Sequence, residues 1–398
     1  MKKKIIIYTG GFEMPDKNPA SHRVSSNAKI FQNIGYEIIY IGLSKDIDSV
    51  KMKIHHGSKS YLIPHPKGLF SWAKHITSIK KTLNIISDID TSRLEAIICY
   101  NYPAISMRRL QFFCKKNNVL HISDTTEWYS SKNYKFLRRI IKSIDVQLRM
   151  RYFQTFSDGI ITPGKYLTDY YSKKGKEIVE IPTLFDFDTP LNFNNDDKIK
   201  FIFAGSPFNG LTLKDRSSTK ERLDKIVILF SELAKNNNNF ILDIYGLTES
   251  DYLKVYPEHL KLLNLNKTFI IFNGKVNHSE IISKISLSDF SIFMRNIDRT
   301  VEAGFPTKFS ESITLGTPII CNKISSFEKF MIEGKNSFEL DKDSIKNQVN
   351  KMETILSLSK KNIHEMKTYS KKSEIFHYKN YIQKVNKFLD SINIYSTK

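Results

Sequence analysis

The residues with the clearest chemical potential lie in "MRNIDRTVEAGFPTKFSESITLGTPII", residues 294–320, between two apolar runs. Pro306 suits the first turn of a helix, where its missing N–H costs nothing. The free N–H groups after it, together with the helix dipole, favour a phosphate. Lys308 adds a full positive charge, and Arg295 and Arg299 lie just upstream. The pattern predicts an anion site at the start of a helix.

A carboxylate follows the same helix start. Glu311 stands three residues after Lys308, on a neighbouring helix face. A carboxylate in this position can accept hydrogen bonds from two ribose hydroxyls, so phosphate donors followed by a ribose acceptor indicate a nucleotide diphosphate site. The pattern fits a Lys–Glu ion pair on a solvated helix equally well.

A second strand end, "FAGSPFNGLTLKDRSSTKERLDKI", repeats this logic. Gly205 and Gly210 permit a close approach of the backbone to a ligand. Four cationic residues follow, and one or two of them could meet the diphosphate: Lys214, Arg216, Lys220 and Arg222. The alternative interpretation is a set of surface charges around a long loop.

Two strand ends in the first half of the chain carry weaker signals. Gly10 and Gly11 follow the first strand, and His22 and Arg23 open the next helix, but the G-x-G-x-x-G pattern is absent. A histidine at a helix start also fits a capping or surface role.

In "SDTTEWYS", Asp124 and Glu127 follow a buried strand. Acids at such a place can orient a sugar or transfer a proton, and Asp124 fits equally well as the cap of the following turn.

The elements that must position these residues follow a regular rhythm. Short apolar runs alternate with amphipathic helical segments, which predicts parallel sheets covered by helices on both faces. The rhythm restarts after a polar segment near residues 182–198. We therefore expect an α/β protein with two Rossmann-like, doubly wound domains, 1–182 and 195–368, and a helical tail, 369–398. Because ligands bind beyond the carboxyl ends of parallel strands, the two domains should face a common cleft.

Composition narrows the class of protein. The chain has 398 residues, of which 40% are hydrophobic and 26% charged, a soluble globular balance with no run of about eighteen apolar residues that could span a membrane. The three cysteines lack zinc or redox spacing and fit core positions. The "MKKKIIIYTGGFE" start lacks a cleavage site and fits a buried strand better than a signal peptide. A cytoplasmic protein is expected.

The formal net charge is +20, which indicates an anionic partner: nucleic acid, an anionic membrane surface or a phosphorylated ligand. Two basic amphipathic stretches, residues 67–83 and 132–151, either lie on a membrane surface or form solvated helix faces. No nucleic-acid module matches the sequence, so nucleic acid is not expected as a partner.

Taken together, the motifs resemble those of the GT-B glycosyltransferases of group 1, also called family four. The resemblance rests on "GGFEMPDKNPASHRVSSNAKIFQNIGYEIIYIG", "DTTEWYS", "EIPTLFD", "FAGSP", "KERLDK", "DIYGLT" and, above all, "AGFPTKFSESITLGTPIICN". Members of this family are retaining enzymes that use nucleotide-sugar donors. The chain is similar to bacterial members that build capsules, lipopolysaccharide or other surface glycans.

The resemblance implies a role for each motif. Lys308 and Lys220 would contact the donor diphosphate, and Glu311, as the second glutamate of the E-x7-E motif, would bind the ribose. Gly10 and Gly11 would approach the donor from the first domain. The backbone that would hold phosphate and sugar comprises Gly304, Phe305, Pro306 and Thr307.

The resemblance also implies an acceptor site in the first domain and a last helix that crosses back to that domain. The candidates for acceptor contact or proton transfer are His22, Arg23, Asp124 and Glu127. Lys308, Lys220 and Arg295 would stabilise the leaving group, so no metal or other cofactor is expected. A lipid-linked glycan is the first choice of acceptor and a glycoprotein the second, with a peripheral position on the inner face of the cell membrane.

Two departures from the family pattern stand out. The first motif glutamate should fall at Ala303, but Glu302 lies one residue earlier. The histidine that many members carry after the strand is also displaced, because His121 lies inside it, so Asp124 or Glu127 would take that place. An inactive GT-B scaffold subunit and a sugar-nucleotide epimerase on the same fold remain as alternatives.

Overall fold

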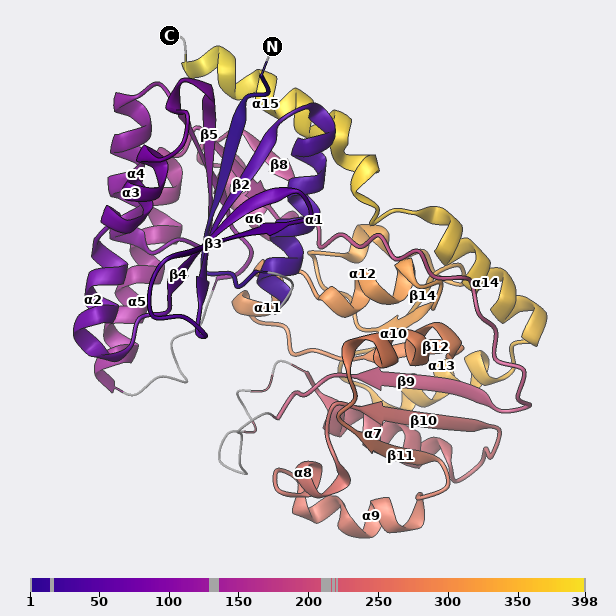
Figure 1. Ribbon diagram of the computed structural model, residues 1–398. Helices are drawn as coiled ribbons and strands as arrows, with labels where there is room; N and C mark the ends of the chain where they lie inside the picture. The colour runs from indigo at the N-terminus through magenta and orange to yellow at the C-terminus, as the bar shows by residue number, and fades with distance from the viewer. Residues whose placement is uncertain are drawn as a thin grey trace. The chain divides into compact units, whose positions relative to one another are not determined.

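The computed structural model describes residues 2–14, 18–128, 136–208, 216, 219 and 221–396. The chain divides into two compact units (Figure 1). Unit 1 contains Met1–Leu184, Glu302–Phe305 and His377–Lys398, and unit 2 contains Phe185–Val301 and Pro306–Phe376. The domains expected from the sequence, 1–182 and 195–368 with a tail at 369–398, stay a prediction.

Unit 1 is built on an eight-stranded sheet in the order β3-β4-β2-β1-β5-β6-β7-β8. Its strands are β1 (Ile5–Gly10), β2 (Glu37–Ser44), β3 (Lys51–His55), β4 (Ser58–Pro64), β5 (Leu94–Tyr100), β6 (Leu120–Asp124), β7 (Gly159–Thr162) and β8 (Ile178–Glu180). Neighbouring strands are parallel except in the β3–β4 hairpin. The sequence analysis missed this hairpin because β3 is largely exposed and carries no apolar run.

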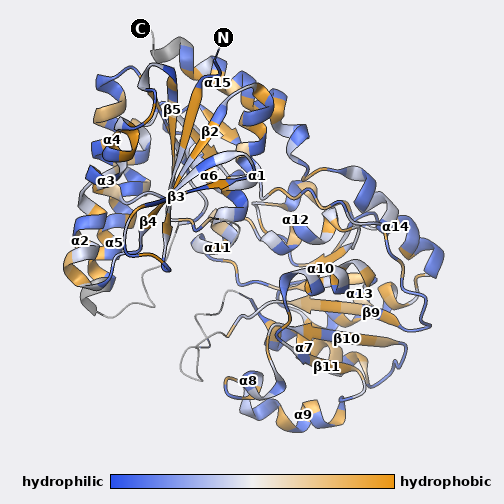
Figure 2. Cartoon of the chain, viewed as in Figure 1, coloured by the Kyte–Doolittle hydropathy of each residue, from blue (hydrophilic) through white to orange (hydrophobic). Residues whose placement is uncertain are grey.

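Helices cover both faces of this sheet (Figure 1). They are α1 (Pro19–Ile34), α2 (Gly68–Thr77), α3 (Lys80–Ser87), α4 (Ala104–Lys116), α5 (Phe136–Arg151), α6 (Lys165–Ser172) and α15 (Ile382–Ser396). Alternate residues of β1 enter different cores: Ile6 and Tyr8 pack in a cluster with α1 and α15, and Ile5 and Ile7 pack in a cluster with α3 and α4. This alternation is the two-residue period of a strand buried on both sides, and the strands appear apolar in Figure 2.

The last helix, α15, belongs to unit 1 although it is distant in sequence. It contributes Val385, Phe388, Leu389 and Ile392 to the core shared with α1. Gly159 on β7 makes this packing possible, because a Cβ there would lie 2.3 Å from Cζ of Phe388.

Unit 2 contains a six-stranded parallel sheet in the order β11-β10-β9-β12-β13-β14. Its strands are β9 (Ile199–Ala204), β10 (Phe240–Tyr245), β11 (Ile270–Gly274), β12 (Phe290–Phe293), β13 (Ile319–Cys321) and β14 (Ser337–Glu339). Its helices are α7 (Leu223–Leu233), α8 (Glu249–Leu253), α9 (Leu260–Leu265), α10 (His278–Leu287), α12 (Thr307–Thr314), α13 (Ile345–Leu356) and α14 (Lys360–Ser373), while α11 (Arg299–Ala303) crosses the border between the units. The 3-10 turns of the two units are η1 (Thr91–Arg93), η2 (Phe153–Phe156), η4 (Pro257–His259), η5 (Glu328–Phe330) and η6 (Tyr378–Tyr381).

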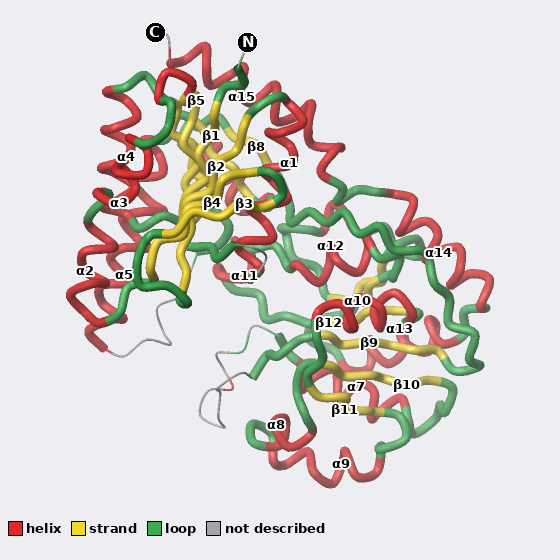
Figure 3. Tube along the Cα trace, viewed as in Figure 1, coloured by secondary structure: helices red, strands yellow, loops and turns green. Residues whose placement is uncertain are grey.

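Both sheets are doubly wound, which confirms the predicted fold class (Figure 3). In unit 1 the chain starts at β1 in the middle of the sheet and adds strands on one side of β1. It then returns to the other side of β1 with β5. In unit 2 it starts at β9 and resumes at β12. Ligands of such sheets bind at the carboxyl ends of the strands where the winding reverses. These two places are therefore where functional side chains should be sought.

Candidate active site

The switch point of unit 2 carries a cluster of one acid and two bases. Glu221, just before α7, accepts a hydrogen bond at Oε2 from Nζ of Lys308 and one at Oε1 from Nη2 of Arg295, the latter over 3.1 Å. The three side chains are between 10% and 17% exposed. Arg295 follows β12 and forms an isolated antiparallel bridge with Glu221, so the backbone itself fixes this ion-pair network.

The charges in this cluster depend on one another. Burial alone raises the pKa of Glu221, but Lys308 and Arg295 outweigh it, so the pKa of Glu221 lies below its usual value. Burial lowers the pKa of Lys308, and Glu221 opposes that shift. Glu221 is therefore a carboxylate at neutral pH that helps to keep Lys308 protonated.

Two glycines make room for the lysine. A Cβ on Gly205, at the end of β9, would lie 2.2 Å from Nζ of Lys308. Gly246, at the end of β10, has φ +107°, and a Cβ there would lie 2.3 Å from the carbonyl oxygen of Gly205. The close approach predicted for Gly205 therefore exists, but in this structure the approaching group is the lysine side chain.

Helix α12 starts at Thr307 beside this cluster. The sequence predicted Pro306 inside the first turn of this helix, but Pro306 is the residue just before that turn. No side chain caps this helix start. Glu311 lies one turn further along, is 14% exposed at its side chain and has Oε1 3.4 Å from Nε2 of His278. The helix thus presents an uncapped N-terminus, a cation and a carboxylate within two turns.

The other residues predicted at this site are distributed differently. Arg299 is exposed at the start of α11. Gly304 and Phe305 are grouped with unit 1, whereas Pro306 and Thr307 belong to unit 2. Lys220 lies outside the described residues.

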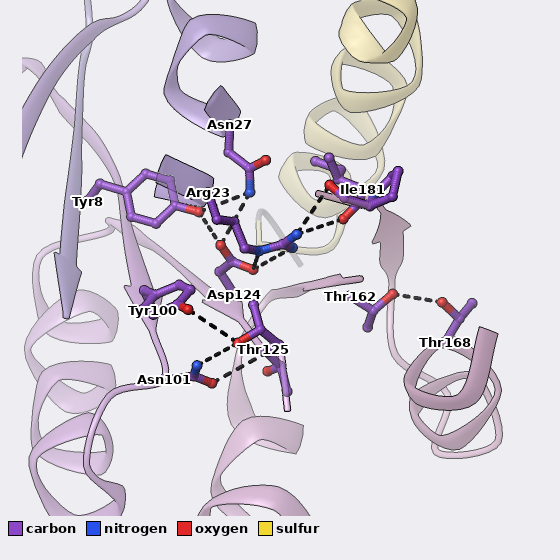
Figure 4. Close-up of polar contacts among 12 residues, drawn as sticks. Tyr8, Arg23, Asn27, Tyr100, Asn101, Asp124, Thr125, Thr162, Thr168 and Ile181 are labelled. Carbon is purple, nitrogen blue, oxygen red and sulfur yellow. Dashed lines mark hydrogen bonds and ion pairs between the residues drawn. The ribbon is translucent and has the colours of Figure 1, made fainter. Parts of the chain in front are cut away.

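Two of the residues predicted in unit 1, Asp124 and Arg23, form a different kind of cluster with Tyr8 and Asn27 (Figure 4). Asp124 has no exposed surface, and its Oδ1 accepts hydrogen bonds from Nε and Nη2 of Arg23 over 3.1 and 2.9 Å. Its Oδ2 accepts from the hydroxyl of Tyr8 and from Asn27. Arg23, which is 4% exposed, also donates to the carbonyl of Ile181 over 2.9 Å.

Asp124 and Arg23 are buried and directed at each other, which fits a structural role. The acceptor and proton-transfer roles expected for them stay predictions. Together the two residues join β1, α1, β6 and the segment after β8. A buried charge needs such a partner, since an unpaired one would be strongly destabilising.

Three further unit 1 candidates have separate environments. Nε2 of His22 lies 2.9 Å from the carbonyl oxygen of Leu184, so its ring supports the backbone after β8. Glu127 is half-buried and keeps some exposed surface. His121 is buried inside β6, and burial lowers its pKa to about 3, so it stays neutral.

The glycine pair ends β1 at the switch point of unit 1. Gly10 has φ +156°, and a Cβ there would lie 2.2 Å from the carbonyl oxygen of Tyr100 at the end of β5. Gly11 is exposed and has open space around its Cα. Gly10 therefore packs closely against the end of β5, and Gly11 is the exposed member of the pair.

Comparison with known protein families finds a match in the second half of the chain. Residues 195–373 match the family described as glycosyl transferases group 1. The Lys308–Glu221–Arg295 cluster and helix α12 both lie within these matched residues.

The fold of the whole chain is that of GT-B glycosyltransferases. Sucrose-phosphate synthase from Thermosynechococcus elongatus superimposes with a TM-score of 0.68 at 10% identity, covering 98% of this chain and 100% of that one. The lipopolysaccharide outer core galactosyltransferase WaaB gives 0.61 at 15% identity, covering 96% and 99%. HepE of Anabaena, in complex with UDP, gives 0.64 at 10% identity, covering 97% and 99%. No curated protein sequence matches significantly.

Sequence reasoning missed one member of the cluster in unit 2. Glu221 stands between Lys220 and Arg222 in a run of charges, and nothing local marks it as the partner of Lys308. Within the described ranges, no group of three or more His, Cys, Asp or Glu side chains could hold a metal ion. No helix in the same part of the chain is long and apolar enough to cross a membrane.

Proposed function

We propose that the protein is a retaining glycosyltransferase that moves a sugar from a nucleotide-diphosphate donor to a glycan acceptor. The observation that carries this proposal is the Lys308–Glu221–Arg295 cluster at the switch point of unit 2, beside the uncapped start of α12. Cations and a helix N-terminus stabilise the negative charge that develops on a departing diphosphate.

Each group then has a role in the proposed reaction. Lys308 and Arg295, with Lys220, bind the diphosphate, and Glu311 accepts hydrogen bonds from the ribose hydroxyls. The acceptor oxygen forms its bond to the anomeric carbon on the face from which the diphosphate leaves, and the acceptor proton passes to a diphosphate oxygen. No protein nucleophile and no metal are required in this scheme.

A thermal-shift screen tests the donor site. UDP is the first nucleotide to try, because HepE of Anabaena binds UDP and UDP-glucose, and ADP is the second, because starch synthase IV from Arabidopsis thaliana was solved with ADP. GDP and CMP complete the set, each with and without magnesium. A bound nucleotide raises the melting temperature by mass action.

Two substitutions make the screen specific. Lys308→Ala and Glu311→Ala should each abolish the nucleotide shift and reduce transfer at least tenfold, a loss of about 1.4 kcal/mol or more. Lys235→Ala is the matched control, because Lys235 is an exposed lysine just past the end of α7 and pairs with Glu232. Normal transfer in both site variants would reject the donor site, and no shift with any nucleotide would favour an inactive scaffold.

We also propose that the acceptor is a lipid-linked glycan used in bacterial surface-glycan synthesis and that the protein docks peripherally on an anionic membrane. Helix α2 supports this: none of its residues is buried, Leu69 and Phe70 are 55% and 86% exposed, and Lys67 and Lys74 flank them. Exposed apolar residues next to lysines favour an anionic lipid surface.

Vesicle sedimentation tests the membrane proposal. Leu69→Ser/Phe70→Ser should weaken binding to phosphatidylglycerol vesicles at least fivefold. The control is Leu265→Ser on α9, which removes a 74% exposed leucine from the other unit. Equal binding of wild type to neutral phosphatidylcholine vesicles, or an equal loss in the control variant, would contradict this docking surface.

A further inference from the structure

A cavity of about 320 Å³ opens within unit 1, and the function proposed above does not assign it. It lies at the carboxyl ends of β1, β2 and β4, beside the switch point, and extends to α2 and α3. Its lining combines the strand ends with Lys74, His75, Lys80 and Lys81. A volume of this size suits a small ligand such as a sugar phosphate.

The charges that line the cavity have one sign. Within the described part of the chain, its lining contains three lysines and a histidine but no carboxylate. Lys74, Lys80 and Lys81 are exposed, and none of them has an ion-pair partner among the described residues. Three unpaired lysines around one hollow repel one another, and an anion between them would remove that repulsion.

Cations also lie close to His75 and at the start of α3. Burial lowers the pKa of His75, and the charges of His65 and Lys81 lower it further, while Asp145 opposes them. Lys80 and Lys81 are also the first residues of α3, a helix with no acid in its first turn and no side-chain cap. Cations at this end of a helix are unfavourable unless an anion is present.

Neutral hydrogen-bonding groups lie beside the lysines. Thr9, Ser71, Ser78, Asn84 and Thr82 contribute to the lining, and the hydroxyl of Thr82 lies 3.0 Å from that of Tyr102. A second cavity of about 160 Å³ shares Gly10, His75 and Tyr102 with the first and adds Trp72. Hydroxyl groups and an aromatic ring next to a cationic pocket suit a sugar that carries a phosphate.

We propose that this cavity binds the phosphate or diphosphate group of the acceptor, so that the acceptor is a phosphorylated glycan. The proposal rests on the transfer reaction proposed above, because it names the class of acceptor for that reaction. The lysines hold the phosphate, and the cavity shared with Gly10 receives the adjoining sugar. The phosphate could be carried by a soluble sugar or by a lipid, and the test separates these sources.

The binding test uses titration calorimetry in a Lys308→Ala background, which disables the proposed donor site. The probes are glucose 1-phosphate, a farnesyl diphosphate-linked glucose in detergent micelles, and methyl glucoside as the phosphate-free control. Lys80→Ala/Lys81→Ala should weaken binding of a phosphorylated probe at least tenfold. Lys115→Ala/Lys116→Ala removes the same charge from two exposed lysines at the end of α4 and should leave the affinity unchanged.

The outcomes are distinct. Tighter binding of the farnesyl probe identifies a lipid-linked acceptor, and tighter binding of glucose 1-phosphate identifies a soluble one. Equal affinity in the two double-lysine variants, or equal binding of methyl glucoside, would overturn the phosphate site. Circular dichroism and the melting temperature of each variant show that a loss of affinity does not come from unfolding.

A second measurement separates this proposal from the donor site. In the otherwise wild-type chain, Lys80→Ala/Lys81→Ala should keep the UDP-induced thermal shift and lose transfer to the phosphorylated acceptor at least tenfold. If no nucleotide raises the melting temperature of the wild type, the donor site is rejected, but the calorimetric binding of the phosphorylated probes still stands. Unchanged transfer in the double variant would reject the phosphate pocket alone.

Discussion

At the scale of single residues, Glu221 organises the candidate site in unit 2. It receives hydrogen bonds from both Lys308 and Arg295, and it is held in place by a backbone bridge to Arg295. A lysine ammonium has three N–H groups, so Lys308 can keep this contact and still donate to a ligand. We therefore regard Glu221 as a residue that positions and charges Lys308.

This role has a pH signature. Burial lowers the pKa of Lys308 and Glu221 opposes the shift, so Glu221→Gln should lower the pKa of Lys308 further. Lys308 then loses its proton at a lower pH, and the affinity for UDP should begin to fall at a lower pH than in the wild type. Calorimetric titration of UDP between about pH 6 and about pH 10 measures this.

The control is Glu232→Gln, which removes the partner of the exposed Lys235 on the same domain. In this variant the affinity for UDP should begin to fall at the same alkaline pH as in the wild type. If Glu221→Gln also leaves the pH at which UDP affinity falls unchanged, Glu221 does not govern the charge of Lys308.

Asp124 and Arg23 show the opposite situation, in which charged residues serve stability. Asp124→Ala leaves Arg23 buried without its carboxylate, which should cost about 3 kcal/mol or more. For a unit of this size, that corresponds to a fall of about 6 °C or more in the melting temperature. Calorimetric unfolding measures the loss, and the apolar double variant Arg23→Met/Asp124→Leu should recover much of it. An unchanged melting temperature combined with lost transfer would restore the catalytic assignment.

At the scale of elements, α15 packs closely against β7 because Gly159 has no side chain at the contact. Gly159→Ala places a Cβ 2.3 Å from Cζ and 2.7 Å from Cε2 of Phe388. This overpacking should destabilise the protein by about 1–3 kcal/mol, because a close-packed core has no space for an added methyl group. Denaturant unfolding measures the change.

Phe388→Leu in the Gly159→Ala background should restore part of that stability, although Phe388→Leu alone removes core volume. Stability losses that simply add in the double variant would show that the two positions do not share a contact.

At the scale of the whole molecule, the two proposed sites belong to different units. UDP should therefore slow amide exchange in the segments after β9 and β12 and in the first turn of α12. Glucose 1-phosphate, in the Lys308→Ala background, should instead slow exchange in α2 and α3. Hydrogen-exchange mass spectrometry with each ligand separately gives both maps. Protection by UDP confined to unit 1 would contradict the donor assignment.

The sequence alone determined the doubly wound α/β fold. The spacing of apolar residues and the positions of glycine and proline are local signals, so they can be interpreted without knowledge of tertiary contacts. For the same reason Lys308, Glu311 and Gly205 could be selected as candidates. Their proposed contacts with a nucleotide stay predictions.

Tertiary structure decided which charges meet. Asp124 and Arg23 are 101 residues apart, and Lys308 and Glu221 are 87 apart, so no local pattern could pair them. The same limit hid the cavity lined by Lys74, Lys80 and Lys81, which the sequence presented only as a basic amphipathic stretch. Spacing along the chain reports which residues share a strand or helix face. Whether a charge is buried with a partner or left open to a ligand depends on elements that only folding brings together.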